Sequence, residues 1–127
     1  MIDHILGSDN YQLSLKLLDA AALRHQAIAT NLANAETPGF KRIDLAPTFE
    51  QQLADHMRNP SNGSIDSIRP TLAQDPTARS EREDGNNVEI DRELLEMNRN
   101  ALEYQFLTQY ASDSIKRLKT AITGRVS

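Results

Sequence analysis

Hydrophobic residues recur with a helical period near the beginning of the chain. From Tyr11 to Leu32 they follow one another at alternating steps of four and three residues, with His25 at one of these positions. This heptad spacing places them along one side of an α-helix and is typical of coiled coils. The sequence therefore predicts a long N-terminal helix with an apolar assembly seam, which comprises Leu15, Leu18, Ala22, Ala29 and Leu32.

A second heptad pattern occupies the C-terminal part of the chain. It continues without a break from Ile90 to Ile122, and a helix of that length spans roughly 50 Å at 1.5 Å per residue. A compact domain of this chain length has a diameter of only about 36 Å, so the helix must extend beyond any such globule. Its seam comprises Ile90, Leu94, Met97, Ala101, Tyr104, Ala111, Ile115, Leu118 and Ile122.

Each predicted helix also carries apolar residues away from its seam. Leu17 and Ile28 lie about 100° around the first helix, and Leu95, Leu102 and Phe106 form a similar stripe on the second. One partner helix cannot cover a seam and an outer stripe together. Because each buried leucine or phenylalanine stabilises by roughly 1.5–3 kcal/mol, the outer stripes predict contacts with neighbouring subunits.

The segment after the first helix begins with a turn. Thr37-Pro38-Gly39-Phe40 has the composition of a type II turn, so the helix is expected to end near Glu36. Residues 41–46 should be extended. Thr48 and Gln51 have the spacing of a capping box, which predicts a short helix over residues 49–57. The side of this helix that docks on the long helices would carry Phe49, Leu53 and Met57.

Prolines and glycines interrupt any periodicity between residues 59 and 87, which predicts a flexible or partner-ordered connector. The chain thus divides into an N-terminal helix (1–36), a turn with an extended segment and a short helix (37–58), the connector (59–87) and a C-terminal helix (88–127). We expect an all-α fold whose two long helices pair antiparallel as a coiled-coil-like hairpin. The apolar seams would then place Ala22 opposite Thr108, to within one helical turn.

Two asparagines close to the turn have two interpretations. Asn31 and Asn34 lie on a face turned away from the seam. They are either exposed polar residues near a helix end or amides that fix the register of a neighbouring subunit.

Composition and charge exclude several functions. The chain has 127 residues, no cysteine and a formal net charge of −4. No basic cluster is combined with stacking aromatic residues, so nucleic acid is not expected as a partner. No apolar run reaches the roughly 20 residues of a membrane-spanning helix, and the first residues lack the pattern of a cleaved signal peptide. Catalytic, metal and cofactor motifs are not found, and His25 has no second ligand at a suitable spacing.

The turn carries a family resemblance. The string Asn31-Leu-Ala33-Asn34-Ala-Glu-Thr37-Pro38-Gly39-Phe40 resembles the N-terminal signature of the axial proteins of the bacterial flagellum, which form its rod and hook. Phe40 stands where tyrosine is usual. Residues 84–94, DGNNVEIDREL, followed by Asn100-Ala101-Leu102 and Tyr104-Gln105, are similar to the C-terminal region of the proximal rod proteins.

This resemblance implies a structural subunit of the flagellar basal-body rod without enzymatic activity or cofactor. Such a subunit is exported through the flagellar type III apparatus and polymerises in the periplasm. Its partners would be further copies of itself, other rod proteins, the export gate and the basal-body ring junction. The alternative is a soluble helical export chaperone or coiled-coil adaptor, which would share the heptads but would not need the turn signature.

Overall fold

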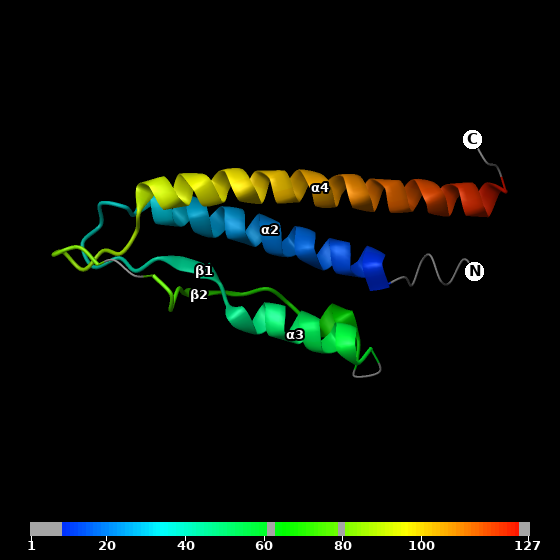
Figure 1. Cartoon of the computed structure of the whole chain (residues 1–127), viewed down its shortest axis with the longest axis horizontal. Coiled ribbons are helices and arrows are strands. Elements are labelled where there is room, and N and C mark those ends of the chain that lie inside the picture. The colour runs from blue at the N-terminus through cyan, green and yellow to red at the C-terminus, as the bar shows by residue number, and fades with distance from the viewer. Residues whose placement is uncertain (1–8, 61–62, 79–80, 125–127) are drawn as a thin grey trace.

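The computed structural model describes residues 9–60, 63–78 and 81–124, and two long helices dominate it. Helix α2 spans Asp9–Ala33 with 25 residues, and α4 spans Ile90–Thr123 with 34 residues. They lie side by side, and α4 extends past the described start of α2 (Figure 1). The prediction of a long helix near each end is therefore confirmed. Residues 1–8 and 125–127 of the two predicted terminal parts lie outside the described residues.

Helix α2 ends at Ala33 and not near Glu36. The amide N of Asn34 already bonds the carbonyls of Thr30 and Asn31, at 3.1 and 3.2 Å, which tightens the last turn. The predicted turn follows, because the N–H of Phe40 donates to the carbonyl of Thr37 at 3.2 Å. Gly39 has φ +77°, as the third position of a type II turn requires.

The predicted short helix is also present. Helix α3 spans Pro47–Arg58. Its predicted capping box is wrong, since Ala46 is the N-cap and makes no side-chain cap hydrogen bond. Pro47 occupies the first helical position, where its fixed φ suits the helix and its missing N–H costs no bond. Thr48 consequently lies inside the helix.

A small apolar core joins α3 to α2. Phe49 and Leu53 pack with Ala20 of α2 and with Ile65 and Ile68 from the connector. Met57 does not share this environment, because it is 41% exposed. Docking of the short helix on a long one is therefore confirmed for Phe49 and Leu53 only.

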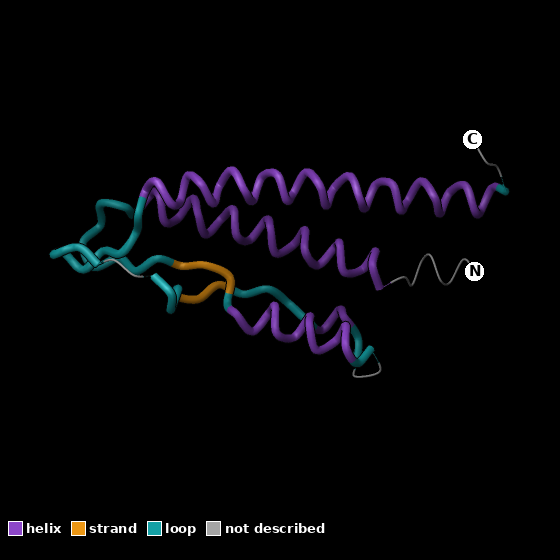
Figure 2. Tube along the Cα trace, in the orientation of Figure 1, coloured by secondary structure: helices purple, strands orange, loops and turns teal. Residues whose placement is uncertain are grey.

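The described part of the connector contains two short regular elements, and the fold is mostly helical but not all-α. A short 3-10 helix, η1, spans Ile65–Ser67, and β2, Leu72–Gln74, pairs antiparallel with β1, Ile43–Leu45 (Figure 2). These elements are too short to produce a sequence period, which is why the pattern did not indicate them. In Figure 1, α2 lies between α4 on one side and β1, β2 and α3 on the other.

One ion pair fixes the start of the strand pair. The carbonyl of Arg42 accepts from the amide of Asp75 at 2.9 Å, and Arg42 Nη1 lies 2.8 Å from Asp75 Oδ2. Burial raises the pKa of the Asp75 carboxyl, but hydrogen bonds from Thr77 and the charge of Arg42 outweigh it. The net effect lowers the pKa of Asp75 below its usual value.

We expect Leu53→Ala to lower the free energy of unfolding by about 2–5 kcal/mol, because it opens a cavity in the core between α3 and α2. Thermal or urea unfolding of the purified chain, followed by circular dichroism, measures this loss. Met57→Ala on the same helix is the matched control and should change stability by less than about 0.5 kcal/mol. Equal losses for both variants would contradict the assignment of the core.

The Arg42–Asp75 pair makes stability depend on acid. Because the folded pKa of Asp75 is lowered, its contribution is complete above the unfolded pKa of about 3.9 and is lost as pH falls through the folded value. Asp75→Asn should therefore destabilise the chain at pH 7 by about 1–3 kcal/mol. The difference from the unmodified chain should shrink below about pH 4. Asp19→Asn, at an exposed position of α2, serves as control, and a pH-independent difference for Asp75→Asn would contradict the prediction.

Candidate functional site

The asparagine that opens the turn signature is fully buried. Asn31 has 0% exposure. Its Oδ1 accepts from the N–H of Ile43 at 2.9 Å and its Nδ2 donates to the carbonyl of Ile43, also at 2.9 Å. The amide thus pairs with the backbone of β1 in the way that a neighbouring strand would.

A buried carboxylate on α4 continues this network. Asn31 Nδ2 also lies 3.3 Å from Glu93 Oε2, and Glu93 Oε1 accepts from Arg42 Nε. Glu93 is 0% exposed and Arg42 2%. Burial alone would lower the pKa of the Arg42 guanidinium, but its hydrogen bonds to Glu93 and Asp44 and their negative charge raise it. Arg42 is therefore a permanent cation, and it neutralises the buried carboxylate.

A second buried asparagine holds the end of α2. Asn86 is 0% exposed, and its Nδ2 lies 2.9, 3.1 and 2.9 Å from the carbonyl oxygens of Asn34, Ala35 and Thr37. Its Oδ1 accepts from the N–H of Val88 at 2.8 Å. Carbonyl groups at a helix end lack partners within the helix, so this side chain supplies donors where the chain leaves α2.

The turn and the loop of Asn86 approach each other closely. The N–H of Gly39 donates to the carbonyl of Asp84 at 2.7 Å. A Cβ added at Gly85, whose φ is +84°, would lie 3.4 Å from the Cα of Gly39. The Pro-Gly turn therefore provides both the reversal and the space in which residues 84–87 fit.

Neither interpretation of the two asparagines is correct for Asn31, which is buried and whose amide oxygen and nitrogen both bond residues of its own chain. Asn34 is half-buried, and its side chain bonds Thr30 and Thr37. The amides therefore join segments of one subunit. Of the other signature residues, Ala33 and Pro38 are exposed and Phe40 is half-buried.

The predicted seams are not the buried part of the contact between α2 and α4. None of the seam residues, all of which the structure describes, is buried. The exposed ones are Leu15, Ala22, Ala29, Ile90, Leu94, Ala101, Tyr104 and Ile122, and the half-buried ones are Leu18, Leu32, Met97, Ala111, Ile115 and Leu118. The side of α4 that is buried instead carries Glu93, Asn100 and Leu107.

The physical reason is that polar residues occupy much of the helix contact. Glu93 and Asn100 find their partners in Asn31, Arg42 and the backbone of Ala21. A sequence pattern assigns such residues to solvent. The apolar seam of α4 lies next to this line, since each residue adds about 100° around the helix.

The outer-stripe residues of α2 and those of α4 differ in their exposure. Ile28 is 1% exposed, so it is not free for a neighbouring subunit, and the prediction was wrong for this residue. Leu17 is half-buried and packs against the core cluster with part of its side chain. Leu95, Leu102 and Phe106 are exposed by 56, 67 and 69%. For these three residues, contact with neighbouring subunits stays a prediction, and their exposure agrees with it.

The contacts also correct the expected register. Asn100 Nδ2 donates to the carbonyl of Ala21 at 2.8 Å. Ala22 lines a pocket with Ala101 and Tyr104. The neighbour of Ala22 is therefore about two helical turns earlier along α4 than Thr108. The buried bonds of Asn31 and Asn100, not the apolar seams, set this register.

Sequence reasoning missed the four polar residues that organise the site: Arg42, Asn86, Glu93 and Asn100. The only sequence signal for these residues was that they lie in, or next to, the strings that carry the family resemblance. Among residues 9–60, 63–78 and 81–124, His, Asp and Glu side chains form no group of three that could hold a metal. In the same residues no helix combines the length and the apolar character needed to cross a membrane.

Known proteins place the chain in a family. No protein-family model matches it. It is 31% identical to the flagellar basal body rod protein FlgB of Aeromonas hydrophila over 133 residues, which covers 96% of this chain and 95% of the relative. FlgB of Aquifex aeolicus is 34% identical over 107 residues, or 80% of this chain and 83% of the relative. FlgB of Bacillus subtilis is 28% identical over 115 residues, or 84% and 88%. The chain belongs to the FlgB family of flagellar basal body rod proteins.

Proposed function

We propose that this structural rod subunit polymerises with copies of itself and with other rod proteins through the exposed apolar residues of α4. The observation that carries the proposal is the exposure of Leu95, Leu102 and Phe106 in the first half of a 34-residue helix. Leucine and phenylalanine left in water on one helix forgo roughly 1.5–3 kcal/mol each, which contact with a neighbour recovers.

The proposal includes the surroundings that the family resemblance implies. The subunit reaches the periplasm through the flagellar type III export apparatus without a cleaved signal peptide. It polymerises at the cell-proximal end of the rod, with the export gate and the basal-body ring junction on one side and other rod proteins on the other. Its role is mechanical, because packed helices transmit torque. The FlgB relatives do not favour the alternative of a chaperone or adaptor.

We infer that the subunit enters the rod as an antiparallel hairpin of α2 and α4. Two pairs of contacts support this arrangement: Asn31 with Glu93 near the turn, and Ala21 with Asn100 further along. As residue numbers fall along α2 they rise along α4, and the intervening residues 34–89 lie at the end where α2 stops and α4 begins (Figure 1).

Replacing apolar residues of the outer stripe should prevent assembly without unfolding the subunit. Leu102→Asp or Phe106→Asp places a carboxylate in the subunit contact, so we expect the concentration needed for polymerisation to rise at least about tenfold, or about 1.4 kcal/mol. Sedimentation and electron microscopy at increasing protein concentration measure this threshold.

Gln51→Asp introduces the same charge at an exposed position of α3 and should leave the threshold unchanged. Polymerisation of Leu102→Asp at the normal concentration, with an unaltered circular dichroism spectrum, would remove α4 from the proposed contact.

The hairpin register is open to a cysteine test, because the chain has no cysteine of its own. Ala21→Cys with Asn100→Cys should form a disulfide within one chain, since these residues are in direct contact and a disulfide needs Cα atoms about 4.4–6.8 Å apart. Ala22→Cys with Thr108→Cys, the pair expected from the apolar seams, should not. Peptide mapping by mass spectrometry identifies the linked residues, and the reverse result would restore the register set by the seams.

A further inference from the structure

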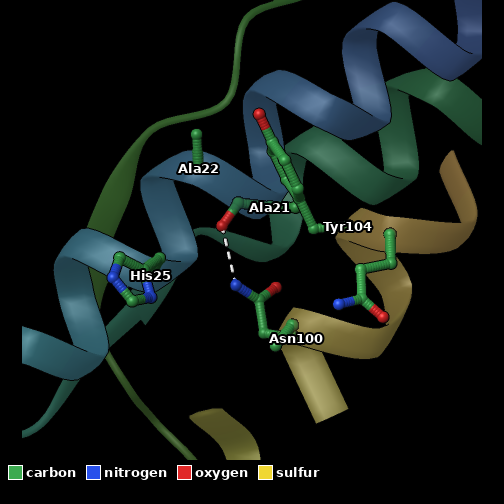
Figure 3. Close-up of a pocket in the computed structure, with 7 residues that line it drawn as sticks. Ala21, Ala22, His25, Asn100 and Tyr104 are labelled. Atoms are coloured by element: carbon green, nitrogen blue, oxygen red, sulfur yellow. Dashed lines mark hydrogen bonds between the residues drawn. The ribbon is translucent and has the colours of Figure 1, made fainter. Parts of the chain in front are cut away.

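A groove between the two long helices contains a polar atom without a partner. The groove has a volume of about 440 Å³, and its walls are built by Ala21, Ala22 and His25 of α2 and by Asn100, Ala101, Tyr104 and Gln105 of α4 (Figure 3). Asn100 is 4% exposed. Its Nδ2 donates to the carbonyl of Ala21, whereas its Oδ1 is buried without a hydrogen-bond partner.

This unsatisfied oxygen indicates that the groove is incomplete in the isolated subunit. A buried acceptor without a donor costs about 1–3 kcal/mol. The other members of the lining are small, aromatic or uncharged, and the alanines leave space where larger side chains would close the helix pair. The groove therefore suits an apolar segment that brings one hydrogen-bond donor.

The chain itself carries a segment of that chemistry. Leu95, Asn98, Leu102 and Phe106 follow one another on one side of α4, and all four are exposed. These four side chains are uncharged, and the amide of Asn98 supplies a donor between two leucines. Arg99 borders the row on the same side of the helix, where its Nη1 lies 3.4 Å from Glu96 Oε1. Leu102 lies about 160° around the helix from Asn100, since two residues advance it by about 200°.

We propose that the groove beside Asn100 receives the Leu95–Phe106 row of a second copy of this chain, with the Asn98 amide donating to Asn100 Oδ1. The row cannot reach the groove of its own subunit, because both lie on nearly opposite sides of the same helix. The contact is consequently heterologous, and a heterologous contact that does not close into a ring builds an open helical assembly. This inference rests on the proposed function and names the surfaces that polymerisation uses.

Disulfide formation between two differently tagged variants tests the pairing. Under assembly conditions, a mixture of Ala22→Cys and Leu102→Cys chains should give a mixed disulfide dimer on oxidation. Thr108→Cys replaces Leu102→Cys as control, because Thr108 is also exposed but lies about 120° or more around α4 from Leu95, Leu102 and Phe106, and it should give at least about tenfold less product. The linked peptides are identified by mass spectrometry.

Blocking the groove is the second test and does not depend on cysteine geometry. Ala22→Trp fills the groove from an exposed position and should raise the concentration needed for assembly by at least about tenfold, or about 1.4 kcal/mol. Gln26→Trp, also exposed on α2, should have no such effect. Circular dichroism confirms that both variants keep their helices.

The possible outcomes distinguish a failure of the proposed function from a failure of this inference alone. If the unmodified chain does not assemble alone or with other rod proteins, the proposed function fails and this inference fails with it. If the unmodified chain assembles while Ala22→Trp assembles equally well and no Ala22–Leu102 disulfide forms, the groove is not the receptor and only this inference is overturned.

Discussion

Three separate segments of the chain meet at the carboxylate of Glu93. Asn31 reaches it from α2, Arg42 from the segment before β1, and Glu93 itself projects from α4. All three are almost completely buried, so a shift of one helix along the other would leave a charge without a partner. Breaking a buried ion pair costs about 3–5 kcal/mol. The register of the two helices and the path of the chain between them therefore depend on this one cluster.

Polar groups make the buried contacts of α4 inside the subunit, and this agrees with the surface position of many of its apolar residues. Hydrophobic burial is strong but not directional, and the large apolar side chains of α4 are mostly exposed. The buried residues of α4 are Glu93, Asn100 and Leu107. Directional bonds thus fix how the subunit folds, while a large apolar area remains available for its neighbours. Burial of this apolar area would favour assembly, and the directional bonds give each subunit a defined shape in which to assemble.

The sequence was sufficient for the elements that generate a long period or a specific turn. Both long helices, the Pro-Gly turn and the short helix could be predicted, because heptads and proline stereochemistry act locally. The face on which α2 and α4 meet could not, since Glu93 and Asn100 read as solvent-exposed positions until their distant partners are known. The β1–β2 pair and η1 were missed because their ordering depends on Arg42, Asp75 and the core around Phe49. The family resemblance identified the sequence strings that contain the buried asparagines. It did not indicate that these side chains form hydrogen bonds within the subunit.

The family signature and the proposed assembly surface therefore act through different physical interactions. Asn31, Gly39 and Asn86 lie at the end of the helix pair where the chain reverses, and their bonds are made within the subunit. Leu102 and Phe106 lie on the outside of α4 and contribute little to the isolated fold, because they are 67 and 69% exposed. Substitutions at the signature should change how many subunits fold, whereas substitutions on the outer row should change how folded subunits associate. Motility alone cannot distinguish these causes, because both reduce the number of complete rods.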